Sequence, residues 1–264
     1  MGTVYSIISG GLFIAKAVVI VLSSYGLARF VLDPGNEKDR TFDAAASVAV
    51  RLSAMHGLIL ALVYAQELDD YKGVRNALTE EAVAVSDVYN DALRFGDPAM
   101  GPVNSGLARY VAVVVNEEWR MLGEHQGLSP RAWQEWNAVY EKLLDLTPAT
   151  DRQHYLASRM RERITAIARF RQLRAATAAG GYSTQFWVPA LIGLLLVTVP
   201  FYVFRPTRSH LLLIALFGAY SGILLFFIYA FSNPFQQPGR LEPLPIEHLL
   251  QGEMGQRLKD DPVQ

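Results

Sequence analysis

The sequence predicts an all-α protein with four membrane-spanning helices and a polar helical domain inserted between the second and the third. Three observations support this fold class. Hydrophobic residues make up 51% of the 264 residues and charged residues only 19%, whereas an ordinary soluble domain has roughly 25% charged residues. The apolar residues gather near both ends of the chain. The region between them is polar and shows the periodicity of helices, with no convincing strand pattern.

The first predicted span covers residues 4–31. At about 1.5 Å rise per residue it is long enough to cross a ~30 Å hydrocarbon core. Residues 1–3 carry no basic side chain, and the apolar stretch is too long for the core of a signal peptide. We therefore expect an uncleaved membrane anchor.

The second predicted span covers residues 44–66 and follows a loop rich in Pro, Gly and charge at residues 32–43. Its hydropathy alone is marginal because it contains Arg51 and His56.

The third and fourth predicted spans, residues 186–204 and 211–231, contain no charged residue. Only a short linker separates them, which predicts a tight antiparallel hairpin. Pro189 and Pro200 predict kinks in the third span.

The polar middle, residues 67–184, is predicted to form a helical domain. The second span should continue as a helix to about residue 93, followed by helices at 107–122, 129–146 and 150–179. Ser129 is a suitable N-cap, with Pro130 at the first helical position. Gly180 and Gly181 should end the last of these helices.

The predicted organisation is therefore two spans in residues 1–66, a helical domain in 67–184, two spans in 185–232 and a Pro-rich segment in 233–264. Its last residues, 252–264, are expected to be mobile.

Topology follows from the basic residues near the ends of the spans. Four spans put both termini and the helical domain on one side, and a slight excess of basic residues makes that side cytoplasmic. The basic residues counted there are Lys72, Arg75, Arg169, Arg171, Arg174 and Arg240, against Arg29, Lys38, Arg40, Arg205 and Arg208 on the other side. The base-rich helix at 151–174 should either lie near anionic headgroups or pair with the acidic helices.

Composition excludes several classes of function. The net charge of −1 gives no argument for a nucleic-acid partner. The absence of Cys excludes disulfides, thiolate metal sites and a cysteine nucleophile. The sequence contains no phosphate-binding loop and no hydrolase or kinase motif, so we expect neither an enzyme nor a cofactor.

Ionisable residues inside the spans are the first candidate site. Lys16, Arg51 and His56 would place several basic groups and no acid at membrane depth, which favours an anion path through an oligomer. The alternative is that Lys16 and Arg51 extend to the membrane surface.

A stripe on the second span is the second candidate. His56 and Glu67 are eleven residues apart and share a helix face, with Leu60 and Val63 between them. This order of side chains is typical of a pore helix with an apolar constriction. The alternative is a histidine that packs against a neighbouring helix and a glutamate at the water interface.

Acidic residues of the middle region are the third candidate: Glu80, Glu81, Asp87, Asp91, Glu117 and Glu118. A di-metal bundle needs a Glu-x-x-His pairing, and neither acidic cluster has one. We expect a solvated, charge-paired surface and no metal. Trp119, Trp133, Trp136, Tyr110 and Tyr140 are expected in the core.

The order of spans, helical insert, hairpin and Asn-Pro-Phe segment resembles the bestrophins, and more specifically a group of bacterial bestrophin-like membrane proteins of unknown function. The residues that carry the resemblance are 56–67 (HGLILALVYAQE), Glu81, Ala82, Asp87, Tyr89, Glu117, Glu118, Trp119, Trp187 and Ser232, Asn233, Pro234 and Phe235. It covers nearly the whole chain.

The resemblance implies a protein of the bacterial inner membrane that forms a homopentameric ion channel, with lipid and permeant ions as partners. The second span would line the pore, with a neck at His56, Leu60, Val63 and Tyr64, and Lys16, Arg51 and Glu67 would set selectivity. Bestrophins conduct anions in animals, while bacterial relatives can prefer cations. Residues 236–240 (QQPGR) replace the Gly and acidic run used for calcium sensing, so calcium gating is not implied.

The function predicted from the sequence is therefore passive ion flux through a bestrophin-like oligomer, with anions favoured over cations. The alternative is a non-conducting membrane scaffold or signalling protein whose helical domain binds a soluble partner.

Overall fold

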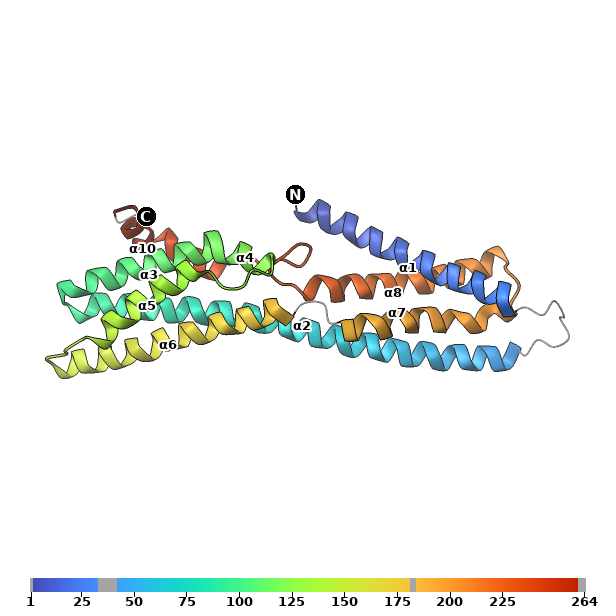
Figure 1. Cartoon of the computed structure of the whole chain (residues 1–264), viewed down its shortest axis with the longest axis horizontal. Coiled ribbons are helices and arrows are strands. Elements are labelled where there is room, and N and C mark those ends of the chain that lie inside the picture. Colours follow the sequence, from blue (N-terminus) through green and yellow to red (C-terminus); the bar gives the residue numbers. More distant parts are fainter. Residues whose placement is uncertain (1, 33–41, 181–183, 261–264) are drawn as a thin grey trace. The chain divides into compact units, whose positions relative to one another are not determined.

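The structure is a computed structural model that describes residues 2–32, 42–180 and 184–260. All regular secondary structure in these residues is helical (Figure 1), which confirms the all-α fold class. The chain divides into two compact units. Unit 1 comprises Met1–Asp70, Tyr182–Asn233 and Gln237–Gly239, and unit 2 comprises Tyr71–Gly181, Pro234–Gln236 and Arg240–Gln264.

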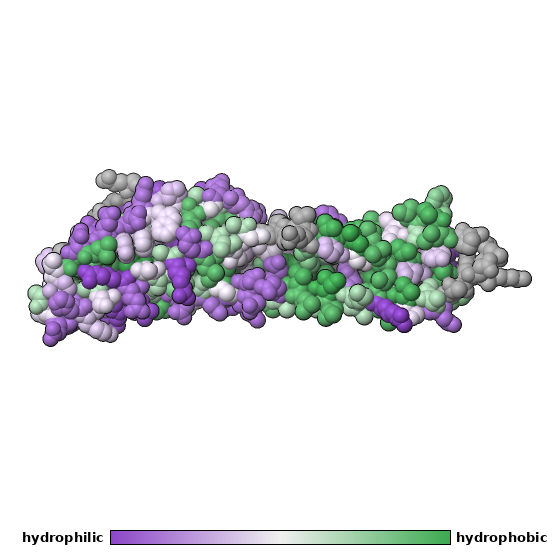
Figure 2. Space-filling view, turned by 60° about the horizontal axis from the view of Figure 1, so that its bottom comes forward, coloured by the Kyte–Doolittle hydropathy of each residue, from purple (hydrophilic) through white to green (hydrophobic). Residues whose placement is uncertain are grey.

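Unit 1 contains the spanning helices. They are α1 (Gly2–Leu32), the first part of α2 (Phe42–Phe95), α7 (Thr184–Thr198) with the 3₁₀ helix η4 (Val199–Val203), and α8 (Arg208–Phe231). Among the residues that the structure describes, four helices are long and apolar enough to cross a membrane, as predicted. Hydrophobic side chains cover the face of these helices that is seen in Figure 2, whereas unit 2 is largely hydrophilic.

Small residues let α1 and α8 pack closely side by side (Figure 1). A Cβ atom on Gly222 would lie 2.8 Å from the Cα of Ile14. A Cβ atom on Gly218 would lie 3.1 Å from the Cα of Val18. Helix association in lipid depends on this kind of close backbone approach.

The prolines of the third span act differently from each other. The helix α7 continues through Pro189, whereas Pro200 lies where the α-helix gives way to the tighter turn η4. The carbonyl of Phe204, just beyond η4, accepts hydrogen bonds from Tyr25 Oη at 2.9 Å and Arg29 Nη1 at 2.8 Å. These two bonds hold the end of α1 against the end of the third span.

Unit 2 is a helical bundle. It contains the rest of α2, α3 (Gly101–Val113), the π-helical turn η3 (Val114–Glu118), α4 (Trp119–Gly123), α5 (Pro130–Leu144) and α6 (Asp151–Gly180). The helix expected at 107–122 thus begins earlier and contains a π-helical turn. Ser129 caps α5 as predicted, because its Oγ accepts a hydrogen bond from the Ala132 amide at 3.3 Å.

The segment after α8 also packs in unit 2. It forms α9 (Leu244–Glu247), η5 (His248–Gln251) and α10 (Glu253–Asp260), and α10 packs on α3. Met254 is buried in the core. The expectation of a mobile tail is therefore wrong for residues 253–260, because α10 contributes an apolar side chain to that core.

Parts of several predictions fall outside the described residues. These are the loop at 33–41 with Lys38 and Arg40, Gly181 as a helix stop, and the tail at 261–264.

Candidate functional site

The predicted pore stripe on α2 faces the interior of unit 1. His56 and Leu60 are only 4% and 2% exposed. The imidazole of His56 fills the space beside Gly193 of α7, and Leu60 belongs to an apolar cluster with Leu194. Val63, Tyr64 and Glu67 are half-buried. The centres of the Tyr64 and Phe231 rings lie 5.8 Å apart. The predicted neck positions His56 and Leu60 thus lie on a different helix face from the one that unit 1 exposes.

The opposite face of α2 is exposed. Met55, Leu58 and Leu62 are 64%, 62% and 63% exposed, and Arg51 is also exposed. Their spacing of four, three and four residues puts them on one side of the helix. We call these four residues the exposed stripe. Sequence reasoning missed it because both faces of this span are apolar, so composition does not reveal which face the neighbouring helices cover.

Lys16, the other basic residue predicted to act in selectivity, is exposed on α1 beside the buried Ala17. Lys16 and Arg51 therefore both have side chains at the surface of unit 1.

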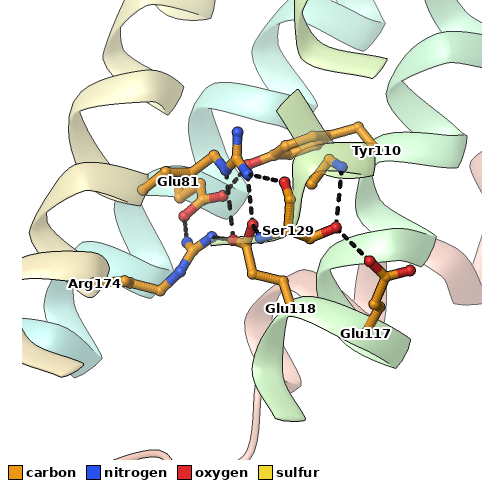
Figure 3. Close-up of polar contacts among 8 residues, drawn as sticks. Glu81, Tyr110, Glu117, Glu118, Ser129 and Arg174 are labelled. Atoms are coloured by element: carbon orange, nitrogen blue, oxygen red, sulfur yellow. Dashed lines mark hydrogen bonds and ion pairs between the residues drawn. The ribbon is translucent and has the colours of Figure 1, made fainter. Parts of the chain in front are cut away.

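Unit 2 contains a cluster of buried charges (Figure 3), which we call the buried network. Its members come from α2, α3, η3 and α6, and each is at most 1% exposed: Glu81, Tyr110, Glu118, Arg171 and Arg174. The network has two carboxylates and two guanidinium groups, so its formal charges balance.

Each carboxylate of the buried network accepts from more than one group. Glu118 binds Arg171 Nη2 through Oε2 at 2.5 Å and Arg174 Nη2 through Oε1 at 2.7 Å. Glu81 pairs with Arg174 Nη1. It also accepts a hydrogen bond from the Tyr110 hydroxyl, with 2.5 Å between the two oxygen atoms. Arg174 therefore bridges α6 to both α2 and η3.

Burial shifts the pKa of two groups of the network, Tyr110 and Glu118. It raises the pKa of Tyr110 well above its ordinary value, so the phenol stays protonated and donates a hydrogen bond to Glu81. Burial also raises the pKa of Glu118, an effect that the hydrogen bond from Arg171 opposes. Such groups form a stable cluster only when each finds a partner.

Two consecutive glutamates in the π-helical turn η3 bind different atoms of Ser129. Glu118 accepts a hydrogen bond from the Ser129 backbone amide at 3.0 Å, while Glu117 accepts one from the Ser129 hydroxyl at 2.5 Å (Figure 3). Glu117 also pairs with Arg131 at 3.3 Å. The Arg171 guanidinium lies 4.2 Å from the centre of the Trp133 ring. The start of α5 is thus attached to the buried network.

Two predictions about charge need correction. Glu81, Glu118 and Asp91 were expected on a solvated surface, but they are buried and ion-paired. Arg171 and Arg174 were counted among the basic residues that set the topology, but they are fully buried and paired with Glu81 and Glu118, which neutralise their charges within unit 2. Of the two alternatives for the basic helix, pairing with the acidic helices is the one that the structure contains.

A periodic signal for these arginines was present in the sequence. The buried stripe of α6 runs through Leu156, Met160, Ile164 and Ile167, and continues at the same spacing through Arg171, Arg174 and Ala178. Two arginines at core positions of an amphipathic helix predict buried partners of opposite charge. Among the described residues, no group of three or more His, Asp or Glu is arranged to hold a metal ion.

The remaining motif residues anchor the segment that follows the last span. The rings of Trp119 and Phe235 meet edge to face at 5.1 Å. Trp119 Nε1 donates to the Leu241 carbonyl at 2.8 Å, and the Leu241 amide donates to the Pro234 carbonyl at 2.7 Å. Asn233, which belongs to unit 1, is also buried. The motif residues Trp119, Pro234 and Phe235 therefore make a packing contact within unit 2.

Comparisons with known proteins agree with this architecture. Residues 15–246 match the protein family described as Bestrophin-like domain. A variant of a bacterial bestrophin homologue from Klebsiella pneumoniae is 10% identical, with a TM-score of 0.67 over 94% of this chain and 97% of that chain. A crystal structure described only as a membrane protein is 10% identical, with a TM-score of 0.67 over 97% and 99%.

Another variant of the Klebsiella homologue is 11% identical, with a TM-score of 0.66 over 97% of this chain and 99% of that chain. At such identity, the likeness shows a shared fold. No curated protein matches the sequence.

Proposed function

The chain belongs to the bestrophin-like family, and from this premise we propose that it forms an ion-conducting pore in a membrane as a homo-oligomer. Bestrophins are channels rather than enzymes, and four helices of this chain are suited to cross a membrane. Flux through the pore would be passive. A pentamer in the bacterial inner membrane, with both termini and unit 2 in the cytoplasm, is the arrangement that we propose.

The observation that carries the proposal is the exposed stripe on α2. It combines Arg51 with three apolar residues on a face that the rest of unit 1 leaves uncovered. A charged side chain that faces hydrocarbon is costly, so a face with an arginine within a span is better suited to water than to lipid. We therefore propose that this face of α2 lines the lumen, in place of the face with His56 and Leu60.

The exposed stripe also suggests how ions would pass. Met55, Leu58 and Leu62 from each subunit would form a hydrophobic constriction that opens and closes by wetting. Arg51 would place a ring of positive charge at one end of it and favour anions, with Lys16 as a second basic group. Val63, Tyr64 and Glu67 are half-buried, and in the pore they would lie beside the constriction.

Two equivalent substitutions test which face lines the lumen. We expect Leu62→Ala to raise the single-channel conductance in a planar bilayer, because it removes bulk from the constriction. Leu60→Ala should leave the conductance unchanged and lower stability by about 2–5 kcal/mol, because it leaves a cavity between packed helices. A rise in conductance for Leu60→Ala alone would instead support the neck first predicted from the sequence.

Selectivity is tested by the reversal potential in a KCl gradient. The proposal expects a reversal near the chloride equilibrium potential, and a shift away from it in Arg51→Gln. Protein that is folded and inserted but passes no current would favour the alternative of a non-conducting scaffold. A stoichiometric soluble partner bound by unit 2 would then be the result to seek.

A further inference from the structure

A pocket of about 120 Å³ lies between α2, α7 with η4, and α8 of unit 1. It is partly open, since Leu213 on its wall is 64% exposed. Apolar side chains form most of its wall, including Phe201, Leu213, Ile214 and Phe217. An engineered apolar cavity of roughly 150 Å³ binds benzene. The cavity therefore has about the size of one six-membered ring.

One polar atom on the wall lacks a partner. The Nε2 atom of His210 is buried and has no hydrogen-bond partner among the described residues. The hydroxyl of Thr198, also on the wall, already donates to the Leu195 carbonyl at 2.9 Å. A buried polar atom without a partner carries a free-energy cost that a ligand able to hydrogen-bond would remove.

The surroundings of His210 fix the orientation of its ring. The backbone amide of His210 donates to Thr207 Oγ1 at 3.2 Å, at the start of α8. The rings of Tyr25 and Phe204 lie 5.4 and 5.5 Å from the imidazole. The imidazole thus lies among aromatic rings at the start of α8.

The chemistry of the wall selects the ligand. A hydroxyl group both donates and accepts, so it can bind Nε2 in either neutral tautomer of the imidazole. Phe201 and Phe217 line the pocket, and aromatic rings favour edge-to-face contacts with such side chains. A charged ligand is disfavoured because the wall offers no opposite charge. We propose that this cavity binds a small aromatic alcohol of the size of phenol, with its hydroxyl on His210 Nε2.

Binding of 4-fluorophenol to the purified full chain in detergent micelles, followed by ¹⁹F NMR against empty micelles, tests the proposal. Saturable binding is expected for the wild type. Ile214→Phe fills the cavity and should abolish it, whereas Leu212→Phe, an exposed position on the same helix, should leave it unchanged. Ser53 of α2 also lines the pocket, so Ser53→Leu should narrow it. This variant serves in place of Ile214→Phe if Ile214→Phe does not fold.

The contribution of the ligand's hydroxyl group is tested by comparing 4-fluorophenol with fluorobenzene. His210→Phe keeps an aromatic ring but removes the nitrogen atoms. It should weaken 4-fluorophenol binding about fivefold, the effect of one hydrogen bond, without changing the binding of fluorobenzene. Equal binding by the wild type and the filled variants would overturn the cavity as the site. Equal affinity of the wild type for fluorobenzene and 4-fluorophenol would overturn the contact with His210.

Discussion

Removal of Arg174 is the sharpest test of the buried network. In Arg174→Met, the carboxylate of Glu81 keeps only the Tyr110 hydroxyl as a partner, and Glu118 keeps Arg171. All of these groups remain fully buried. Loss of one partner from a buried ion pair costs about 3–5 kcal/mol, because the other charge stays in the interior without compensation. We expect a loss of stability of that size.

The same helix provides a matched control. Arg163 pairs with Asp87 at 3.1 Å, but their side chains are 41% and 31% exposed. An ion pair this exposed contributes no more than about 1 kcal/mol, so Arg163→Met should have a small effect. The double variant Glu81→Met/Arg174→Met removes one charge of each sign and leaves Glu118 paired with Arg171. It should be more stable than Arg174→Met alone.

Tryptophan fluorescence during thermal unfolding of the full chain in detergent measures these differences. Trp119 reports on the network directly, since the Arg174 guanidinium lies 5.9 Å from the centre of its ring. The reasoning fails if Arg174→Met lowers the unfolding midpoint no more than Arg163→Met does. It also fails if the double variant is less stable than Arg174→Met, because the buried charges would then not be coupled.

Three further predictions concern packing and pH. The pKa of Tyr110 is raised above its ordinary 10.0 in the folded state, so the unfolded state loses the phenol proton at lower pH. The stability of the wild type should therefore fall as pH rises above about 10. Unfolding midpoints measured over this pH range should fall less steeply in Tyr110→Phe. Gly222→Val should disrupt the packing of α1 on α8. The control Gly57→Val should fold normally, because a Cβ atom at Gly57 meets nothing within 4 Å. Size-exclusion profiles in detergent would distinguish the two variants, and equal profiles would contradict the packing argument. Phe235→Ala should cost about 3–5 kcal/mol and change the emission of Trp119; an unchanged midpoint would show that this contact does not hold the segment after α8.

Hydropathy predicts the spans because long apolar segments have few alternatives to a membrane. It does not show which face of a span is covered by protein. The stripe with Leu60 and the stripe with Leu62 are both largely apolar, and the packing of unit 1 shows which of them is covered. Of the pore residues chosen from spacing alone, His56 and Leu60 therefore came from the covered face.

The buried network shows a different limit. A basic helix and an acidic helix predict some pairing, and the ion pairs between α6 and α2 fulfil that expectation. Counting charges treats every arginine as a surface group, however, and so misplaces Arg171 and Arg174. Their positions on the apolar stripe of α6 carry the missing information, because a charge at a core position has to be neutralised there.

The contact between Phe235 and Trp119 has a consequence for biosynthesis. Unit 2 is discontinuous in sequence, since its core also uses side chains that follow α8, such as Phe235, Ile246 and Met254. A ribosome makes these residues after all four spans, whereas most of the bundle that they complete is made before α7. The nascent bundle therefore has an uncovered apolar surface while the last two spans enter the membrane, and it can reach its final form only when translation has passed α10.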